Sequence, residues 1–309
     1  MNRVPAARWS DVCLRARVAV QEGDDRPMDQ ATNSPRAAWR RGDGTNLIGI
    51  PTGLFASAAF NSAHRPVQIA GVREMNADLF KLLATAGSME EASGLFSAYM
   101  ATMFGLADGR VPVRSEVAPN EPPPRRHYRS SYLRLLRGWA FDSNGSEGAV
   151  LKGWVESRFG LVPTYHRQPL TDFHTAAWSQ YVEEKMSSRF HNNAILSQLD
   201  LLYEFAQWFL ARFQPEQTHL RLYRGVNDFE EHQIVERRPR RQVVLRLNNL
   251  VSFTSERDMA SWFGDHILEA EVPKTKVLFF TTLLPRHALK GEGELLVIGG
   301  DYLVTASYY

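Results

Sequence analysis

The spacing of hydrophobic residues changes near Pro215. Before it, apolar side chains recur every third or fourth position, which is the period of an amphipathic helix. After it, apolar and polar residues alternate in short runs bounded by turn residues, as they do in strands. Helices followed by strands predict an α+β fold. Because most connections between these strands are too short for helical crossovers, we expect mainly antiparallel sheets.

Helical signals are strongest from residue 88 to residue 213. Ser88-Met89-Glu90-Glu91 is a capping box, and apolar residues then recur at helical spacing up to Phe104, which predicts a helix over this stretch. Further helices are expected over residues 128–139, 147–159 and 176–213. Gly160 is well placed to end the second of these, and the third is expected to break near His191-Asn192-Asn193.

Strand signals fill the chain after Pro215, where β-branched and aromatic residues gather. The expected strands cover residues 218–223, 242–253, 266–272, 276–280, 294–298 and 302–308. One short helix is expected near residues 259–263. The basic run from Arg237 to Arg241 is interpreted as a solvated loop between strands, or equally as a docking site for an acidic protein.

Domain boundaries follow from these patterns. The first 45 residues are rich in polar residues with little apolar periodicity, and we expect a mobile tail there. Residues 46–309 are expected to form a single domain, with a helical part over 46–215 and a β-rich part over 216–309. A proline-rich stretch over residues 107–126 is interpreted as a surface loop or linker.

Composition and charge exclude several classes of protein. A formal net charge of +2 gives no strong field for nucleic acid, and no run of about 18 apolar residues could span a membrane. Cys13 is the only cysteine, which excludes an internal disulfide and fits a reducing cytoplasm. The histidines show no spacing that is typical of a metal site, so no metal is predicted.

An acid pair stands where an apolar strand begins. Glu292 and Glu294 are separated by Gly293, so both carboxylates point to one face of an extended chain, while the glycine allows a close approach by another molecule. Two like charges this close raise each other's pKa unless a cation lies nearby, and a cationic substrate would supply one. Taken alone, such a pair is most often a solvated strand end.

Two upstream segments favour a functional interpretation of this pair. Leu220 to Val226 predicts a strand ending in Tyr223-Arg224-Gly225, and Leu250 to Ser255 predicts a strand ending in hydroxyl residues. Arginine, serine and Glu-x-Glu, each at a strand end, resemble the Arg-Ser-Glu class of mono-ADP-ribosyltransferases, whose arginine-modifying members carry the acid pair. This class implies a two-sheet core and NAD as co-substrate.

The resemblance covers residues 46 to 309. The stretches from Leu47 to Phe55 and from Arg129 to Trp139 are similar to the dinitrogenase reductase ADP-ribosyltransferase family. That resemblance implies transfer of ADP-ribose to an arginine of the nitrogenase iron protein, dinitrogenase reductase, which inactivates it and regulates nitrogen fixation. It also implies a PII signalling protein as regulator.

The resemblance also implies a role for each motif residue. Glu294 would stabilise the positive charge that develops on the nicotinamide ribose, since nicotinamide leaves as a neutral group and needs no acid. Ser255 is expected to donate a hydrogen bond to that carboxylate, with Ser252 as the second choice. Arg224 would hold the NAD phosphates or the adjoining ribose, and Glu292 would orient the acceptor guanidinium. The remaining residues expected to line the NAD site are Tyr223, Gly225, Ser252 and Thr254.

Two other functions stay open at this stage. An NAD glycohydrolase would use the same Glu294 with water as the nucleophile. A non-catalytic nucleotide-binding module would act by contact alone, but binding NAD does not require both Glu292 and Glu294, so their presence argues against it.

Overall fold

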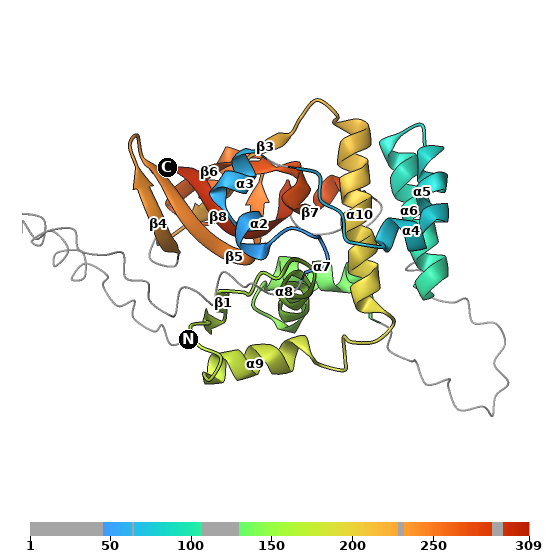
Figure 1. The fold of residues 1–309 in the computed structure, drawn as a ribbon, viewed down its shortest axis with the longest axis horizontal. Coiled ribbons are helices and arrows are strands. Elements are labelled where there is room, and N and C mark those ends of the chain that lie inside the picture. Colours follow the sequence, from blue (N-terminus) through green and yellow to red (C-terminus); the bar gives the residue numbers. More distant parts are fainter. Residues whose placement is uncertain (1–45, 64, 107–129, 228–231, 286–292, 309) are drawn as a thin grey trace, which may run out of the picture. The chain divides into compact units, whose positions relative to one another are not determined.

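The computed structural model describes residues 46–63, 65–106, 130–227, 232–285 and 293–308 (Figure 1). The expected N-terminal tail, the proline-rich stretch and Glu292 lie outside these residues. The α-helices are α2 (Thr52–Phe55), α3 (Ala58–Ser62), α4 (Val72–Met75), α5 (Ala77–Ala84), α6 (Met89–Phe104), α7 (Tyr132–Phe141), α8 (Ser146–Phe159), α9 (Ala176–Lys185), α10 (Ile195–Phe213) and α11 (Arg257–Ser261). The strands are β1 (Tyr165–His166), β2 (Gln168–Pro169), β3 (His219–Val226), β4 (Gln233–Arg238), β5 (Gln242–Thr254), β6 (His266–Pro273), β7 (Val277–Phe280) and β8 (Glu294–Tyr308). This order of helices and strands confirms the α+β prediction.

The helix ends follow the local signals in the sequence. Helix α6 starts where the Ser88 hydroxyl accepts from the amide of Glu91 at 3.2 Å, while the Glu91 carboxylate accepts from the amide of Gly87. Helix α8 ends at Gly160, whose φ of 73° is left-handed. The segment over 176–213 forms two helices, α9 and α10, with left-handed backbone at Asn193 and Ala194 between them. The predicted stop and break are therefore confirmed. The predicted cap by Ser88 is confirmed too, but the Glu91 carboxylate accepts from the amide one residue before the one that a capping box uses.

All strand pairs are antiparallel, and strands β3 to β8 form one hydrogen-bonded network. Its order is β4-β5-β3-β6-β8-β7, with an additional pairing of β5 with β8. Strand β8 joins the two segments expected over 294–298 and 302–308, and its register with β5 shifts between Leu247 and Leu250. The long strands β5 and β8 thus connect the two sheets that the family resemblance implies.

Strand β4 corrects one prediction. Arg237 and Arg238 lie within this strand rather than in a loop, and the turn that follows holds Arg240 and Arg241 at φ of 62° and 61°. Strand β4 is an edge strand that pairs only with β5 in the described structure. Ile234 and Val235 are its only apolar residues, so the sequence carries little of the alternation that marks a half-buried strand.

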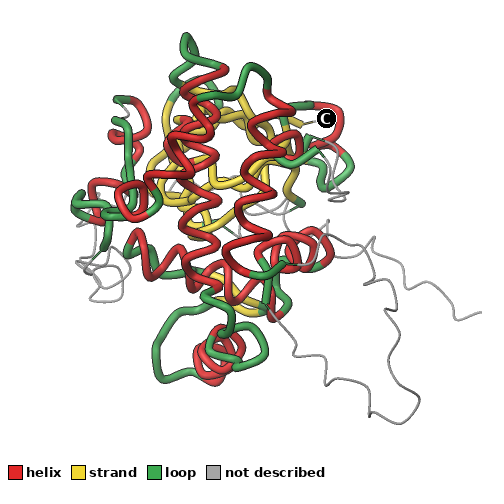
Figure 2. The backbone as a smooth tube through the Cα atoms, turned by 90° about the vertical axis from the view of Figure 1, so that its right-hand side faces the viewer, coloured by secondary structure: helices red, strands yellow, loops and turns green. Residues whose placement is uncertain are grey.

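Helix α10 packs between the strands and the other helices. It contacts strand β7 and also helices α4, α6 and α7. In Figure 2 the long helices lie in front of the strands. Phe205 of α10 stacks on Phe96 of α6 with ring centroids 4.1 Å apart. The buried side chain of Gln198 accepts from the amide of Tyr132 and donates to the carbonyls of Ser130 and Asn193. The start of α7 is thereby fixed to α10.

Helix α11 lies directly on the backbone of β3 because Gly225 has no side chain. A Cβ atom at Gly225 would lie 1.9 Å from the carbonyl oxygen of Ala260 and 3.0 Å from the amide of Gly264. Such a contact cannot be relieved by moving a flexible side chain, so the helix itself would have to shift. Gly225 therefore sets how closely α11 approaches the end of β3.

We expect Gly225→Ala to lower the free energy of unfolding by about 1–3 kcal/mol, because overpacking forces the backbone apart. Urea unfolding of the parent and the variant measures the change. Gly87→Ala is the matched control, since its new methyl group would meet only the Glu91 carboxylate at 3.6 Å. Equal stability of Gly225→Ala and Gly87→Ala would contradict this account of α11 packing.

Candidate active site

Three strands meet at one residue. Thr254, the last residue of β5, pairs with Tyr223 of β3 on one side and with Glu294 of β8 on the other. The arginine, serine and glutamate motifs are separated by tens of residues in the sequence, and antiparallel pairing brings all three to this point. The structure therefore assembles the predicted motifs into one place.

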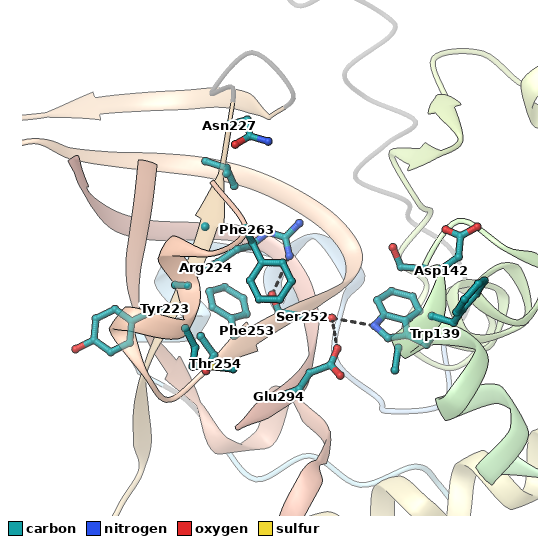
Figure 3. Close-up of a pocket in the computed structure, with 17 residues that line it drawn as sticks. Trp139, Asp142, Tyr223, Arg224, Asn227, Ser252, Phe253, Thr254, Phe263 and Glu294 are labelled. Carbon is teal, nitrogen blue, oxygen red and sulfur yellow. Dashed lines mark hydrogen bonds between the residues drawn. The ribbon is translucent and has the colours of Figure 1, made fainter. Parts of the chain in front are cut away.

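A pocket of about 570 Å³ opens there, which is a size typical of small-molecule sites (Figure 3). Its walls come from the end of α7, from β3, β5 and β8, and from α11 with the residues after it. The predicted residues that line it are Tyr223, Arg224, Gly225, Ser252, Thr254 and Glu294. The ring of Tyr223 points away from Ser252 and Glu294 (Figure 3). Glu292 lies outside the described residues.

A short series of hydrogen bonds orders the pocket wall. The Ser252 hydroxyl donates to Oε1 of Glu294 at 2.7 Å, and the indole Nε1 of Trp139 donates to Oγ of Ser252 at 2.8 Å. Nη1 of Arg224 donates to the carbonyl oxygen of Ser252, also at 2.8 Å. Ser252 therefore contacts the motif arginine, the motif glutamate and a helix of the N-terminal half.

The strand register corrects the assignment of this hydrogen bond from Ser255 to Ser252. Glu294 stands opposite Thr254, and Ser252 is two residues back on the same face, so it is the diagonal neighbour of the carboxylate. Ser255 lies beyond the end of β5 and is exposed. It does not line the main pocket but another cavity of about 370 Å³, to which Gly293 and Glu294 also contribute. Its amide donates to the carbonyl of Gly293.

Thr254 has a structural contact of its own. Its hydroxyl accepts from the amide of Glu256 at 3.1 Å, which closes the turn between β5 and α11. The side chain is buried, and it forms part of the pocket wall. Thr254 thus joins the strand that carries Ser252 to the helix that covers the pocket.

Burial raises the pKa of the Glu294 carboxyl above its usual range. Hydrogen bonding from Ser252, the indole of Trp139 and the positive charge of Arg224 act in the opposite direction. A carboxylate with restricted access to water interacts more strongly with a neighbouring positive charge than an exposed one does. Glu294 is therefore placed to stabilise a cation that forms inside the pocket.

A second cavity of about 250 Å³ adjoins the first and shares Trp139, Arg224 and Ser252 with it. Lys152 and His232 line this cavity as well. Burial lowers the pKa of Lys152 to about 7, and burial with the nearby charge of Arg224 lowers the pKa of His232 to about 4. His232 is accordingly neutral near pH 7.

The described residues contain no cluster of three or more His, Cys, Asp or Glu side chains that could hold a metal ion. Among these residues there is likewise no helix with the length and apolar character needed to cross a membrane. The pocket instead offers a guanidinium, a hydroxyl and a carboxylate, lined in part by the aromatic rings of Phe141 and Phe263. Such a set suits a ligand with both charged and flat apolar parts.

Trp139 is the contact residue that sequence reasoning missed. It lies in a segment that resembles the family, but a tryptophan on the apolar face of a helix is indistinguishable from an ordinary core residue. Its donor role depends on where α7 meets β5, which is a tertiary contact. Asp142 and Phe263 also line the pocket without any signal in the sequence.

Comparison with known proteins agrees with the motifs. A family model described as dinitrogenase reductase ADP-ribosyltransferase matches residues 45–306. The chain is 60% identical over 268 residues to the NAD(+)-dinitrogen-reductase ADP-D-ribosyltransferase of Rhodospirillum rubrum, an alignment that covers 86% of this chain and 96% of that relative. No solved structure matches the chain. On the strength of the family match and this identity, the chain belongs to the dinitrogenase reductase ADP-ribosyltransferase family.

Proposed function

We propose that this protein transfers ADP-ribose from NAD to an arginine side chain of dinitrogenase reductase, the nitrogenase iron protein, and so inactivates it. One observation carries the proposal. This chain is 60% identical to a relative named NAD(+)-dinitrogen-reductase ADP-D-ribosyltransferase, and in it Glu294 accepts a hydrogen bond from Ser252 in a pocket that Arg224 also lines. These are the residue types that the reaction requires, and they come from strands far apart in the sequence.

Arg224 would hold NAD through oxygens of its diphosphate or the adjoining ribose. A guanidinium stays charged and presents paired donors, which match phosphate oxygens. Its own position is fixed by the hydrogen bond from Nη1 to the carbonyl of Ser252. Gly225, next to it, keeps α11 close to the pocket, and Phe263 adds an aromatic wall that suits a flat ring.

Glu294 would act on the sugar. The bond between C1′ of the ribose and the nicotinamide nitrogen breaks, the bonding electrons leave with nicotinamide, and positive charge spreads over C1′ and the ring oxygen. Nicotinamide starts as a cation and departs neutral, so no proton has to be delivered to it. A half-buried carboxylate beside the ribose stabilises this charge, and the Ser252 hydroxyl keeps one carboxylate oxygen in place.

Glu292 would act on the acceptor. A bond forms between a guanidinium nitrogen of the acceptor arginine and C1′, and that nitrogen loses a proton. A carboxylate two residues before Glu294 can orient the guanidinium and accept the proton. Without it, water remains the competing nucleophile.

The same reasoning extends to the setting of the reaction. We propose a single catalytic domain over residues 46–309, a cytoplasmic location, and a PII signalling protein as regulator. The family resemblance supports the regulator, and the single cysteine, Cys13, fits a reducing compartment.

The proposed function can be tested by incubating the protein with NAD labelled in its adenylate half and with reduced dinitrogenase reductase. We expect label on an arginine of the acceptor, with one nicotinamide released for each group transferred. Free ADP-ribose with unlabelled acceptor would instead identify an NAD glycohydrolase. Unchanged NAD would instead indicate a nucleotide-binding module without catalytic activity.

Glu294→Gln is expected to abolish both transfer and NAD hydrolysis, with each rate falling by roughly 100-fold or more, because a neutral amide no longer stabilises the charged sugar that both reactions share. Glu292→Gln should lose transfer yet keep some hydrolysis, since water needs no orienting carboxylate. Nicotinamide release, measured beside label on the acceptor, separates the two. If Glu292→Gln modifies arginine at the parent rate, the proposed division of labour is wrong.

Ser252→Ala should reduce the rate of NAD cleavage by more than Ser255→Ala does. Removing the donor to Glu294 costs about 1–3 kcal/mol, which is roughly 5- to 150-fold in rate. Ser255 bonds through its backbone amide, which the alanine variant keeps, so its rate should stay within about threefold of the parent. Turnover of both variants under saturating NAD decides the matter, and the opposite order would reject the role of Ser252.

A further inference from the structure

Trp139 reaches the pocket from the helical half of the chain. It is only 4% exposed, lies near the end of α7, and contacts the motif strands through its indole Nε1, 2.8 Å from Oγ of Ser252. The indole nitrogen is a donor and has no acceptor capacity. The direction of this hydrogen bond is therefore fixed by chemistry, with Trp139 donating and Ser252 accepting.

This direction determines where the serine proton goes. A hydroxyl carries one proton and can rotate freely about its Cβ–Oγ bond. Because the indole N–H occupies an acceptor position of Ser252, the hydroxyl proton is left for the nearest acceptor, which is Oε1 of Glu294 at 2.7 Å. The indole thus fixes the rotation of the hydroxyl so that it donates to the carboxylate.

The indole is itself held in place. Gln198 of α10 fixes the start of α7 through the amide of Tyr132 and the carbonyl of Ser130. Nζ of Lys152 lies 5.8 Å from the centroid of the Trp139 ring and donates to the side chain of Asn144 and to the carbonyl of Tyr165. A rigid donor can restrain the hydroxyl, whereas a mobile one could not.

We propose that Trp139 is a positioning residue for the reaction, acting on Glu294 chiefly by orienting the hydroxyl of Ser252. The proposal rests on the function proposed above, since it concerns the same carboxylate. It assigns the helical part a role in the chemistry in addition to packing. Trp139 touches Ser252 and need not touch NAD or the acceptor arginine.

The test removes the indole N–H donor and keeps an aromatic ring at position 139. Trp139→Phe removes the N–H. Trp154→Phe is the matched control, because Trp154 is also buried, its Nε1 donates to Asp200 over 2.7 Å, and neither of these two residues lines the pocket. Both variants lose one buried indole hydrogen bond, so both should be less stable. Only Trp139→Phe should lower kcat, by roughly 3- to 30-fold and equally for hydrolysis and transfer, while the Kd for NAD changes less than about twofold.

A double-mutant cycle isolates the path through Ser252. On a Ser252→Ala background, Trp139→Phe should cause a clearly smaller loss of kcat than it does in the parent, because the hydroxyl that it orients is gone. Additive losses would overturn the proposal. So would wild-type kcat in Trp139→Phe, or an equal loss of kcat in the Trp154→Phe control.

The pH profile gives a second readout. Hydrogen bonds to Glu294 lower its pKa, so removing the restraint on Ser252 should raise that pKa and move the acid limb of kcat/KM to higher pH. The charged groups lining the same pocket are Arg224 on β3 and Asp142 at the end of α7, with Lys152 and His232 in the adjoining cavity, and the substitution leaves all of them in place. An unmoved acid limb would contradict the proposal.

Two further measurements keep the proposal testable if the variant does not fold or if the proposed function is wrong. If Trp139→Phe fails to fold, the benzothiophene isostere of tryptophan at position 139 has the same shape without the N–H, and it should give the same loss of kcat. If the parent protein fails to modify dinitrogenase reductase, the proposed function fails. The Glu294 pKa can then be followed by NMR of its labelled carboxyl carbon, where an unchanged value in Trp139→Phe would overturn the positioning role alone.

Discussion

The register of β5 is the constraint on which the site depends. Thr254 pairs with Tyr223 and with Glu294, so one residue aligns the end of β5 with the start of β8 and with the interior of β3. Side chains alternate along a strand, and a shift of one residue would turn Ser252 away from Glu294. Close contacts help to hold this register, since a Cβ at Gly299 would lie 1.6 Å from the carbonyl oxygen of Asn248 in β5. The alignment of the motifs is thus built into backbone packing.

The helical part completes what the strands begin. The strands supply the arginine, serine and glutamate, and α7 supplies the indole that reaches Ser252. A buried polar group on α10 holds that arrangement, since the side chain of Gln198 accepts from the amide of Tyr132 and donates to the carbonyls of Ser130 and Asn193. A polar group buried without a partner is costly, so each of these contacts specifies one arrangement of the helices. The site is therefore formed by both parts of the chain.

The sequence predicted the features that depend on local chemistry. Ser88 and Gly160 mark helix ends through their own hydrogen bonds and backbone angles, and the spacing of apolar residues predicted α6, α8 and most strands. It could not decide between Ser252 and Ser255, because that choice depends on which residue faces Glu294 across two strands. Strand β4 was missed since an exposed edge strand needs no apolar alternation. Trp139 was missed because its partner lies 113 residues away.

The central claim is that the pocket lined by Arg224 and Glu294 binds NAD, and calorimetric titration of NAD into Arg224→Lys tests it most directly. Lysine keeps the charge but loses the paired donors of the guanidinium. Arg238→Lys is the matched control, because Arg238 is exposed on β4, is paired with Glu236, and lies outside the pocket. The account predicts that the Kd for NAD rises by roughly tenfold or more in Arg224→Lys, as expected for the loss of one charged hydrogen bond, and stays at the parent value in Arg238→Lys. An unchanged Kd in a folded Arg224→Lys protein would contradict it.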